Sequence, residues 1–279
     1  ELQKEKASYI IYENDEEKEV TVRIMKFSEA AFAKTGIAKL ELDGILLKPH
    51  KLPDRKIEFI GDSITAAYGV EGVLGENSFT TADENPLLGY AYKTAKLLNA
   101  QFQLISWSGT GVITNYVEET VNEPFLDRWV MPNLYPYADG ELESSLGKKL
   151  SEYEIWDNSK YDPNLVVLFI GTNDGSYTRG IKERQDHFRK EYNKFLDVIR
   201  EKNPNAYILC TIGTMRQELW DVEKMVVDQR KEAGDEKIGF LHLPMQEEAD
   251  GLATDYHPSA ITHTKVANMI ADYCNQYVY

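Results

Sequence analysis

The sequence predicts an α/β fold in which helices cover both faces of a parallel β-sheet. From residue 57 onward, short apolar segments alternate with longer amphipathic ones. This rhythm of strand and helix favours a parallel sheet with right-handed crossovers. One short segment, residues 165–170, is apolar at every position, as expected for a central strand that is covered on both faces. We therefore predict a three-layer α/β domain over residues 52–279.

The N-terminal part of the chain has a different pattern, which predicts antiparallel β-structure. Apolar and polar residues alternate with a period of two, for example over residues 20–25. The pair Asp43 and Gly44 separates two apolar runs, which is a strong hairpin signal because type I′ turns need positive φ at both central residues. Three or four strands are too few for an independent sandwich. We predict that residues 1–51 form an incomplete, jelly-roll-like β-sandwich segment that depends on the following domain.

Five short apolar runs in the α/β part are predicted to be strands. They cover residues 57–60, 102–105, 165–170, 206–212 and 238–243. Three of them end abruptly at a cluster of small or polar residues. At the carboxyl ends of parallel strands, such clusters face the crevice in which open α/β sheets bind ligands.

Apolar residues at helical spacing predict the helices that cover this sheet. The helices cover residues 86–99, 181–203, 222–231 and 260–277. The longest of them has Phe188, Tyr192 and Ile199 on one face, and Pro204 ends it. Residues 114–160 have no regular pattern and contain many aromatic side chains, so this segment is either a binding loop or a cover over the core.

Composition excludes several classes of partner. A formal net charge of −15 argues against nucleic acid, whose binding depends on clustered Lys and Arg. No apolar run approaches the roughly 20 residues that span a bilayer, so we expect no membrane segment. The sequence has no calcium-loop spacing, His-Glu-x-x-His motif or cysteine cluster, so neither a metal nor a cofactor is predicted. Cys210 and Cys274 lie in apolar segments and are expected to be free core thiols.

Ser63 follows the first predicted strand of the α/β part and is a candidate nucleophile. It stands in the segment Gly61-Asp62-Ser63, where an apolar run stops and a helix-compatible stretch begins. The backbone N–H groups that open a helix favour negative charge at this position. The alternative is purely structural, since the side chain of Asp62 or Ser63 would serve equally well as a helix N-cap.

Three further clusters supply the other groups that serine-based acyl transfer needs. Small residues around Gly109 and Gly111 follow the second strand, Asn173 follows the third, and His257 precedes the last helix. A serine hydroxyl needs a base to accept its proton, and the tetrahedral oxyanion needs N–H donors. His257 is the candidate base. The backbone N–H of Ser63, the amide of Asn173 and the N–H of either glycine are candidate oxyanion donors.

These motifs resemble the SGNH/GDSL hydrolase superfamily over residues 57–279. The resemblance rests on the blocks Gly61-Asp62-Ser63-Ile64-Thr65, Ser108-Gly109-Thr110-Gly111, Gly171-Thr172-Asn173-Asp174 and His257-Pro258. It implies a flavodoxin-like parallel sheet, Ser63 as nucleophile, His257 as base, and Ser63, Gly111 and Asn173 as the oxyanion hole. No Gly-x-Ser-x-Gly elbow is present, which disfavours the common α/β-hydrolase arrangement.

The N-terminal β-segment, with Lys26 to Ala30 and the Asp43-Gly44 hairpin, is similar to the end of the β-sandwich in carbohydrate esterase family 2. Enzymes of that family remove O-acetyl groups from plant polysaccharides. The resemblance implies an acetylated carbohydrate as substrate and an extracellular or cell-surface bacterial location; the oligomeric state stays open. Trp107, Gly109 and Trp220 are candidate substrate-binding residues.

One departure from the superfamily pattern concerns the triad acid. Many members carry Asp-x-x-His, but Thr254 occupies the position three residues before His257, and the nearest acid is Asp255. We therefore expect a Ser63–His257 dyad to which Asp255 contributes less than a triad acid. Because the base must be neutral, a modestly perturbed histidine would lose activity around pH 6 to 7, roughly its ordinary pKa range.

Two other functions are compatible with this sequence. A lipase or thioesterase of the same fold would need an apolar groove for a long acyl chain. A carbohydrate-binding protein without catalysis would need the same aromatic residues but no serine, asparagine and histidine in one site, and the joint presence of all three counts against it.

Overall fold

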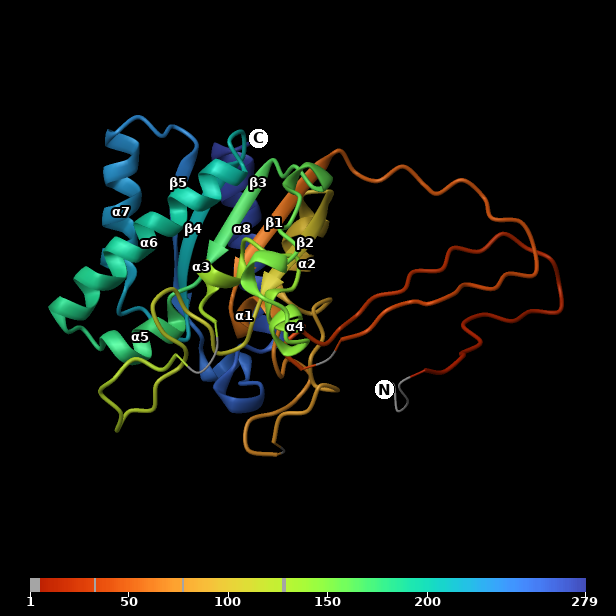
Figure 1. Ribbon diagram of the computed structural model, residues 1–279, viewed down its shortest axis with the longest axis horizontal. Coiled ribbons are helices and arrows are strands. Elements are labelled where there is room, and N and C mark those ends of the chain that lie inside the picture. Colours follow the sequence, from red (N-terminus) through yellow and green to blue (C-terminus); the bar gives the residue numbers. More distant parts are fainter. Residues whose placement is uncertain (1–5, 33, 77, 127–128) are drawn as a thin grey trace.

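A computed structural model describes residues 6–32, 34–76, 78–126 and 129–279 of the chain. Within these residues, five parallel strands form one sheet in the order β2-β1-β3-β4-β5 (Figure 1). The strands are β1 (Arg55–Gly61), β2 (Ala100–Ser106), β3 (Leu165–Phe169), β4 (Tyr207–Thr214) and β5 (Ile238–Met245). This is the flavodoxin-like strand order, so the predicted α/β class is confirmed.

The helices lie between successive strands, except for α8, which follows the last strand. They are α1 (Ser63–Ala66), α2 (Tyr90–Leu97), α3 (Met131–Leu134), α4 (Gly140–Ser145), α5 (Thr172–Thr178), α6 (Lys182–Lys202), α7 (Trp220–Glu232) and α8 (Ala260–Tyr277). Short 3₁₀ turns lie at Leu150–Glu152, Asn158–Lys160, Glu248–Asp250 and Thr254–Tyr256. The four longest helices coincide with the predicted ones. The helix α1 begins at Ser63, where the sequence predicts a helix after the first strand. The short helices α3, α4 and α5 have too few turns to give a periodic pattern and are not predicted by the sequence.

Alternate residues of the central strands pack into two separate cores, one on each face of the sheet. On one face, Ile60 and Val166 pack with the apolar stripe of α6 and with α7. On the other, Phe59 and Val167 pack with α2 and α8. The residues of both cores are almost fully buried. Helices therefore cover both faces, which makes the three layers predicted from the sequence.

The register of the sheet brings three strand ends to one place. Gly61, the last residue of β1, pairs with Ser106 at the end of β2 and with Phe169 at the end of β3. β1 lies between these two strands, at the point where the strand order reverses, and such a switch point opens a crevice beyond the carboxyl ends. The loops that follow β1, β2 and β3 consequently meet there.

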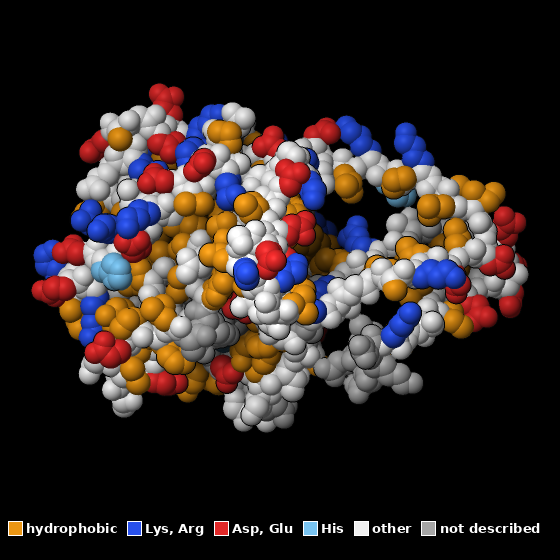
Figure 2. Space-filling model, viewed as in Figure 1, with side chains coloured by type: hydrophobic (Ala, Val, Ile, Leu, Met, Phe, Trp, Pro, Cys, Tyr) orange, Lys and Arg blue, Asp and Glu red, His pale blue; other side chains and the backbone are white. Residues whose placement is uncertain are grey.

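The antiparallel strands predicted in residues 1–51 are not confirmed. The described residues before Arg55, 6–32 and 34–54, contain no strand. They run out from the domain as a wide loop and return to β1 (Figure 1). Hydrophobic side chains lie open along this loop (Figure 2); Ile10 is 81% exposed and Leu46 is 87% exposed. An alternating apolar face needs a second layer to pack on, and none covers these residues. The domain boundary at residue 52 stays a prediction.

Two smaller expectations concern the cysteines and the membrane. Cys210 and Cys274 are both buried and free, as predicted. None of the helices in the described part of the chain is both long and apolar enough to span a bilayer.

Candidate active site

The turn after β1 fixes Ser63 at the start of α1. A side chain at Gly61 would place its Cβ 2.1 Å from Thr65 Oγ1 and 2.5 Å from the Phe169 carbonyl oxygen, so only glycine fits the turn. Asp62 is the N-cap of α1, because its Oδ1 accepts a hydrogen bond from the N–H of Ile64 at 3.0 Å. The capping role proposed for this segment therefore belongs to Asp62, and the hydroxyl of Ser63 is left for another partner.

That partner is His257. Its Nε2 lies 2.8 Å from Ser63 Oγ, although the two residues are 194 positions apart in the chain. Nδ1 lies 3.2 Å from the carbonyl oxygen of Thr254 and 3.2 Å from that of Asp255. Since carbonyl oxygens only accept, the proton sits on Nδ1 and Nε2 accepts from the serine hydroxyl. Backbone carbonyls thus hold the tautomer that a general base needs.

The loop before His257 brings the carboxylate of Asp255 to the hydroxyl of Tyr68. Asp255 and Tyr256 both have left-handed backbone conformations, with φ of 52° and 63°, a region that Asp tolerates better than most residues. The Asp255 carboxylate accepts a hydrogen bond from Tyr68 Oη at 2.9 Å. The ring of Tyr68 lies 4.5 Å from the imidazole, centroid to centroid. Asp255 therefore touches His257 through its carbonyl group.

Burial keeps the imidazole neutral. It lowers the pKa of His257 from its ordinary value to about 4, and the hydrogen bonds to the carbonyls of Thr254 and Asp255 oppose this shift only in part. A base with this pKa is unprotonated throughout the neutral range. The pH 6 to 7 expected for a modestly perturbed histidine is therefore too high for this environment.

Asn173 and Asp174, at the start of α5, hold the loop that follows β2. Asn173 Nδ2 donates to the Thr110 carbonyl oxygen at 2.8 Å and lies 3.3 Å from Asp62 Oδ2. The carboxylate of Asp174 accepts from the N–H groups of Val112 and Ile113, with the closer bonds both at 2.8 Å. The contact to Asp62 is longer than usual for an N–H donor, so one amide hydrogen of Asn173 is only weakly engaged.

Both candidate glycines lie in this loop, and each has its own reason to be glycine. Gly109 has a left-handed backbone with φ of 78°. A Cβ on Gly111 would lie 2.4 Å from Asp174 Oδ2, so the absence of a side chain lets the carboxylate reach the neighbouring N–H groups. Which of the two N–H groups serves the oxyanion stays open.

The two tryptophans predicted to bind substrate lie in different places. Trp107 directly follows β2 and is 9% exposed; it lines a cavity beside the N-terminal segment and carries Lys34 Nζ 5.2 Å above its ring. Trp220 begins α7, and its ring lies 4.8 Å from that of His242, centroid to centroid. The substrate-binding roles of Trp107, Gly109 and Trp220 stay predictions.

Two acids of the motif blocks, Asp62 and Asp174, shape this site, although the sequence assigned neither of them a role in the reaction. Burial raises the pKa of Asp62 to about 7 and that of Asp174 to about 6. Asp62 directly precedes Ser63 and Asp174 directly follows Asn173, and an acid at the end of an apolar strand is the signal that marks them. Tyr68 gave no such signal, because Asp255 and His257, which it contacts in the site, are far away in the chain.

The site thus combines the hydroxyl of Ser63, the neutral imidazole of His257 beside it, and N–H donors nearby. The described residues contain no group of three or more His, Cys, Asp or Glu side chains placed to hold a metal ion. The arrangement is suited to activating a serine as nucleophile and to stabilising the oxyanion that follows.

Comparison with known proteins places this arrangement in a family. Two curated relatives are similar in sequence. One is the cellulase/esterase CelE of Acetivibrio thermocellus, 37% identical over 81% of this chain and 26% of that protein. The other is an acetylxylan esterase/glucomannan deacetylase of Cellvibrio japonicus, 31% identical over 70% of this chain and 49% of that protein. The chain thus spans about a quarter of the length of the first relative and about half of the length of the second.

Solved structures of carbohydrate esterases are also similar to this chain. A family two carbohydrate esterase from Clostridium thermocellum, in complex with cellohexaose, is 35% identical and superposes with a TM-score of 0.72 over 83% of this chain and 67% of that one. The acetyl xylan esterase Est2A from Butyrivibrio proteoclasticus is 25% identical, with a TM-score of 0.72 over 82% and 65% of the two chains. The resemblance to carbohydrate esterase family 2 is confirmed. Residues 59–265 match the GDSL-like Lipase/Acylhydrolase family, and the chain belongs to that family.

Proposed function

We propose that this protein is a serine esterase that removes O-acetyl groups from a carbohydrate. The observation that carries the proposal is the 2.8 Å contact between Ser63 Oγ and His257 Nε2, with Nδ1 held by backbone carbonyls. The substrate class is supported by the relatives, which are named as an acetylxylan esterase/glucomannan deacetylase and as family two carbohydrate esterases.

The groups act in the following order. His257 Nε2 accepts the proton of Ser63 as Oγ attacks the acetyl carbonyl carbon, and the carbonyl oxygen becomes an oxyanion. The N–H groups of Ser63 and of Gly109 or Gly111, with the Asn173 amide, stabilise that charge. The imidazolium then gives its proton to the sugar oxygen, which leaves as an alcohol. Water then attacks the acetyl carbon of the acetyl-serine while His257 takes its proton, and as the bond to Ser63 Oγ breaks, the imidazolium returns that proton to Oγ, which releases acetic acid and regenerates Ser63 and neutral His257.

The acyl group separates this proposal from a lipase or thioesterase of the same fold. We expect acetyl esters to be hydrolysed much faster than octanoyl or longer esters. A lipid groove would stabilise each added methylene by about 0.8 kcal/mol, so a lipase would gain from chain length. The measurement is kcat/KM for a series of aryl esters graded by acyl length, with acetylated xylan oligosaccharides alongside.

The Ser63→Ala protein is the control for this series, since it keeps the fold and lacks the nucleophile. Acetate release from the oligosaccharides by wild type alone supports the proposal. A kcat/KM that climbs steadily to octanoyl esters would favour the lipase function instead. Binding of the oligosaccharide without any acetate release would favour the non-catalytic alternative.

The role of Asp255 gives a second prediction. We expect Asp255→Asn to retain a substantial part of wild-type kcat, because His257 Nδ1 is held by carbonyl groups and the Asp255 side chain bonds Tyr68. Neutralising the acid of a full triad costs about 10⁴-fold in kcat. The measurement is kcat on an acetyl ester, with thermal unfolding as the control for folding. A loss of three or more orders of magnitude in the folded variant would show that the carboxylate is a triad member.

A further inference from the structure

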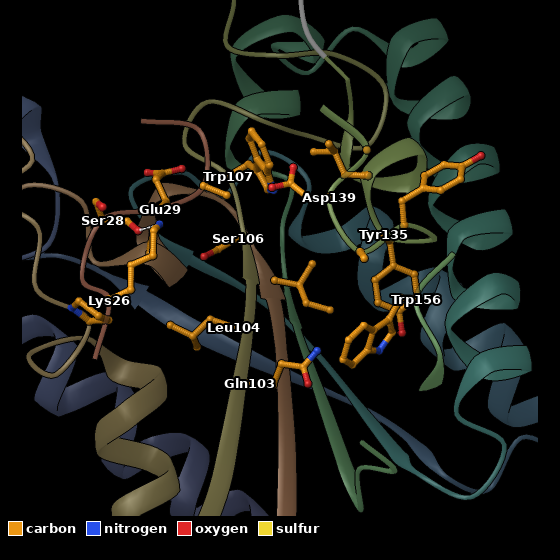
Figure 3. A pocket seen from close by; sticks show the side chains of 18 of the residues that line it. Lys26, Ser28, Glu29, Gln103, Leu104, Ser106, Trp107, Tyr135, Asp139 and Trp156 are labelled. Carbon is orange, nitrogen blue, oxygen red and sulfur yellow. Dashed lines mark hydrogen bonds between the residues drawn. The ribbon is translucent and has the colours of Figure 1, made fainter. Parts of the chain in front are cut away.

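A short part of the N-terminal segment is attached to the active-site loops. Residues 26–32, which we call the anchor segment, lie beside the end of β2, across a cavity of about 350 Å³ (Figure 3). Most of the surrounding N-terminal chain is exposed, but Glu29 is only 8% exposed. Glu29 lies 23 residues before the predicted start of the catalytic domain, so sequence gave no reason to connect it with the site.

The carboxylate of Glu29 is bound to the loop that carries both candidate oxyanion glycines. The backbone N–H of Ser108 donates to Glu29 Oε2, and the Ser108 hydroxyl donates to Glu29 Oε1. Ser108 directly precedes Gly109, whose left-handed backbone makes the path of the loop depend on where Ser108 is held. Two bonds to one carboxylate fix both the position and the orientation of this residue.

A second acid holds Glu29 in place. Glu84 Oε2 accepts a hydrogen bond from the backbone N–H of Glu29 at 3.0 Å. Burial first, and the charge of Glu29 second, raise the pKa of Glu84 to about 8. Glu84 therefore keeps its proton at neutral pH.

The other end of the anchor segment packs near the base. The ring of Phe32 lies 5.2 Å from that of Phe79 and 6.4 Å from that of Tyr68, centroid to centroid. Tyr68 contacts the His257 ring and bonds Asp255. The anchor segment thus touches the surroundings of both the oxyanion loop and the base.

Backbone bonds tie the loop after β2 to its surroundings, from Trp107 N–H to the Gly61 carbonyl and from Tyr116 N–H to the Gly109 carbonyl, and side chains of α5 hold its far side. Asn173 holds Thr110, and Asp174 holds Val112 and Ile113. Glu29 supplies the side-chain bonds on the near side, before Gly109. Because an oxyanion donor must lie about 3 Å from its target, a shift of about 1 Å costs on the order of 100-fold in rate.

We propose that Glu29 is a positioning residue that sets the oxyanion loop through Ser108, so that the N-terminal part of the chain contributes to catalysis by the domain that follows it. The inference rests on the proposed serine-esterase function. Glu29 itself does not contact the substrate. It affects the reaction through the backbone N–H of Gly109 or Gly111.

The test compares Glu29→Ala with Glu29→Gln in the whole chain. Glu29→Ala removes both bonds to Ser108 and is expected to lower kcat for an acetyl ester about 10- to 100-fold, with KM within about threefold of wild type. Glu29→Gln keeps an acceptor for the Ser108 N–H and offers an N–H to the Ser108 hydroxyl. This variant is therefore expected to keep most of the wild-type kcat that Glu29→Ala loses. Glu19→Ala, the same change at an exposed position of the N-terminal loop, is the control and is expected to match wild type.

Two further readouts keep the inference separate from the proposed function. The rate of Ser63 labelling by a fluorophosphonate depends on the oxyanion hole but not on the acyl group or sugar, and Glu29→Ala is expected to slow it about as much as kcat. Ser108→Ala and Glu29→Ala are expected to be non-additive, since they remove parts of one contact.

An unchanged kcat and labelling rate in folded Glu29→Ala overturns the inference and leaves the esterase function standing. A wild type that is labelled but does not hydrolyse acetyl esters overturns the proposed substrate, and the labelling rates of the variants still decide the role of Glu29. The fraction of folded Glu29→Ala protein is measured by circular dichroism. If the variant loses activity only in proportion to the folded protein it loses, Glu29 has a structural role and the inference is overturned as well.

Discussion

Replacing His257 with alanine is expected to lower kcat for an acetyl ester by about 10⁴-fold or more, and Ser63→Ala is expected to do the same. The two side chains act as one unit, because the hydroxyl is a poor nucleophile until Nε2 takes its proton. For such units, removal of either member costs nearly as much as removal of both. The double variant should therefore be no worse than either single one. Additive losses in the double variant would contradict a shared step.

The protonation of His257 sets how kcat/KM depends on pH, and this dependence tests independently whether His257 is the general base. His257 acts only when neutral, and burial lowers its pKa to about 4. The base is therefore present above that pH and is lost as the pH falls through it. We expect the loss of kcat/KM that belongs to His257 to have a midpoint near 4, below the pH at which Asp62 and Asp174 gain their protons. A midpoint at or above the ordinary 6.5 would show that the imidazole is better solvated than its surroundings indicate.

Asn173→Ala is expected to cost about 100-fold or more in kcat, the usual loss when one oxyanion donor is removed. Its amide also joins the Thr110 carbonyl to Asp62, so some loss of stability accompanies the change. Asn173→Asp is the informative partner, since it keeps the size of the side chain but removes its N–H donors. The measurement is kcat per folded molecule together with the thermal midpoint. Normal activity in the folded fraction of both variants would assign Asn173 to structure alone.

The sequence predicted the sheet and the meeting of its motifs because both follow from local patterns. Fully apolar runs mark central strands, and a motif at the carboxyl end of each strand is brought to one edge by parallel topology. The same reasoning placed Ser63 and Asn173 each at the end of a strand, and the structure shows that these strands, β1 and β3, are neighbours. His257 could be assigned only by chemistry and resemblance, since nothing local to it indicates a contact 194 residues away.

Other features depend on contacts that no local pattern contains. The direction of the Asp255 carboxylate depends on two successive left-handed residues and on Tyr68. Burial of His257, which lowers its pKa, comes from all the surrounding elements together. The N-terminal alternation predicted strands that the structure does not confirm. Strands form only when a second layer covers their apolar face, and the described residues provide none.

The two buried thiols have a practical consequence for following the N-terminal segment in solution. Burial raises the pKa of Cys210 and of Cys274 to about 12, and thiol reagents attack the accessible thiolate form. A cysteine introduced on the surface would therefore be modified selectively without removing either natural one. A spin label at residue 19 and another on the outer face of α6 would report the distance between the wide loop and the sheet domain.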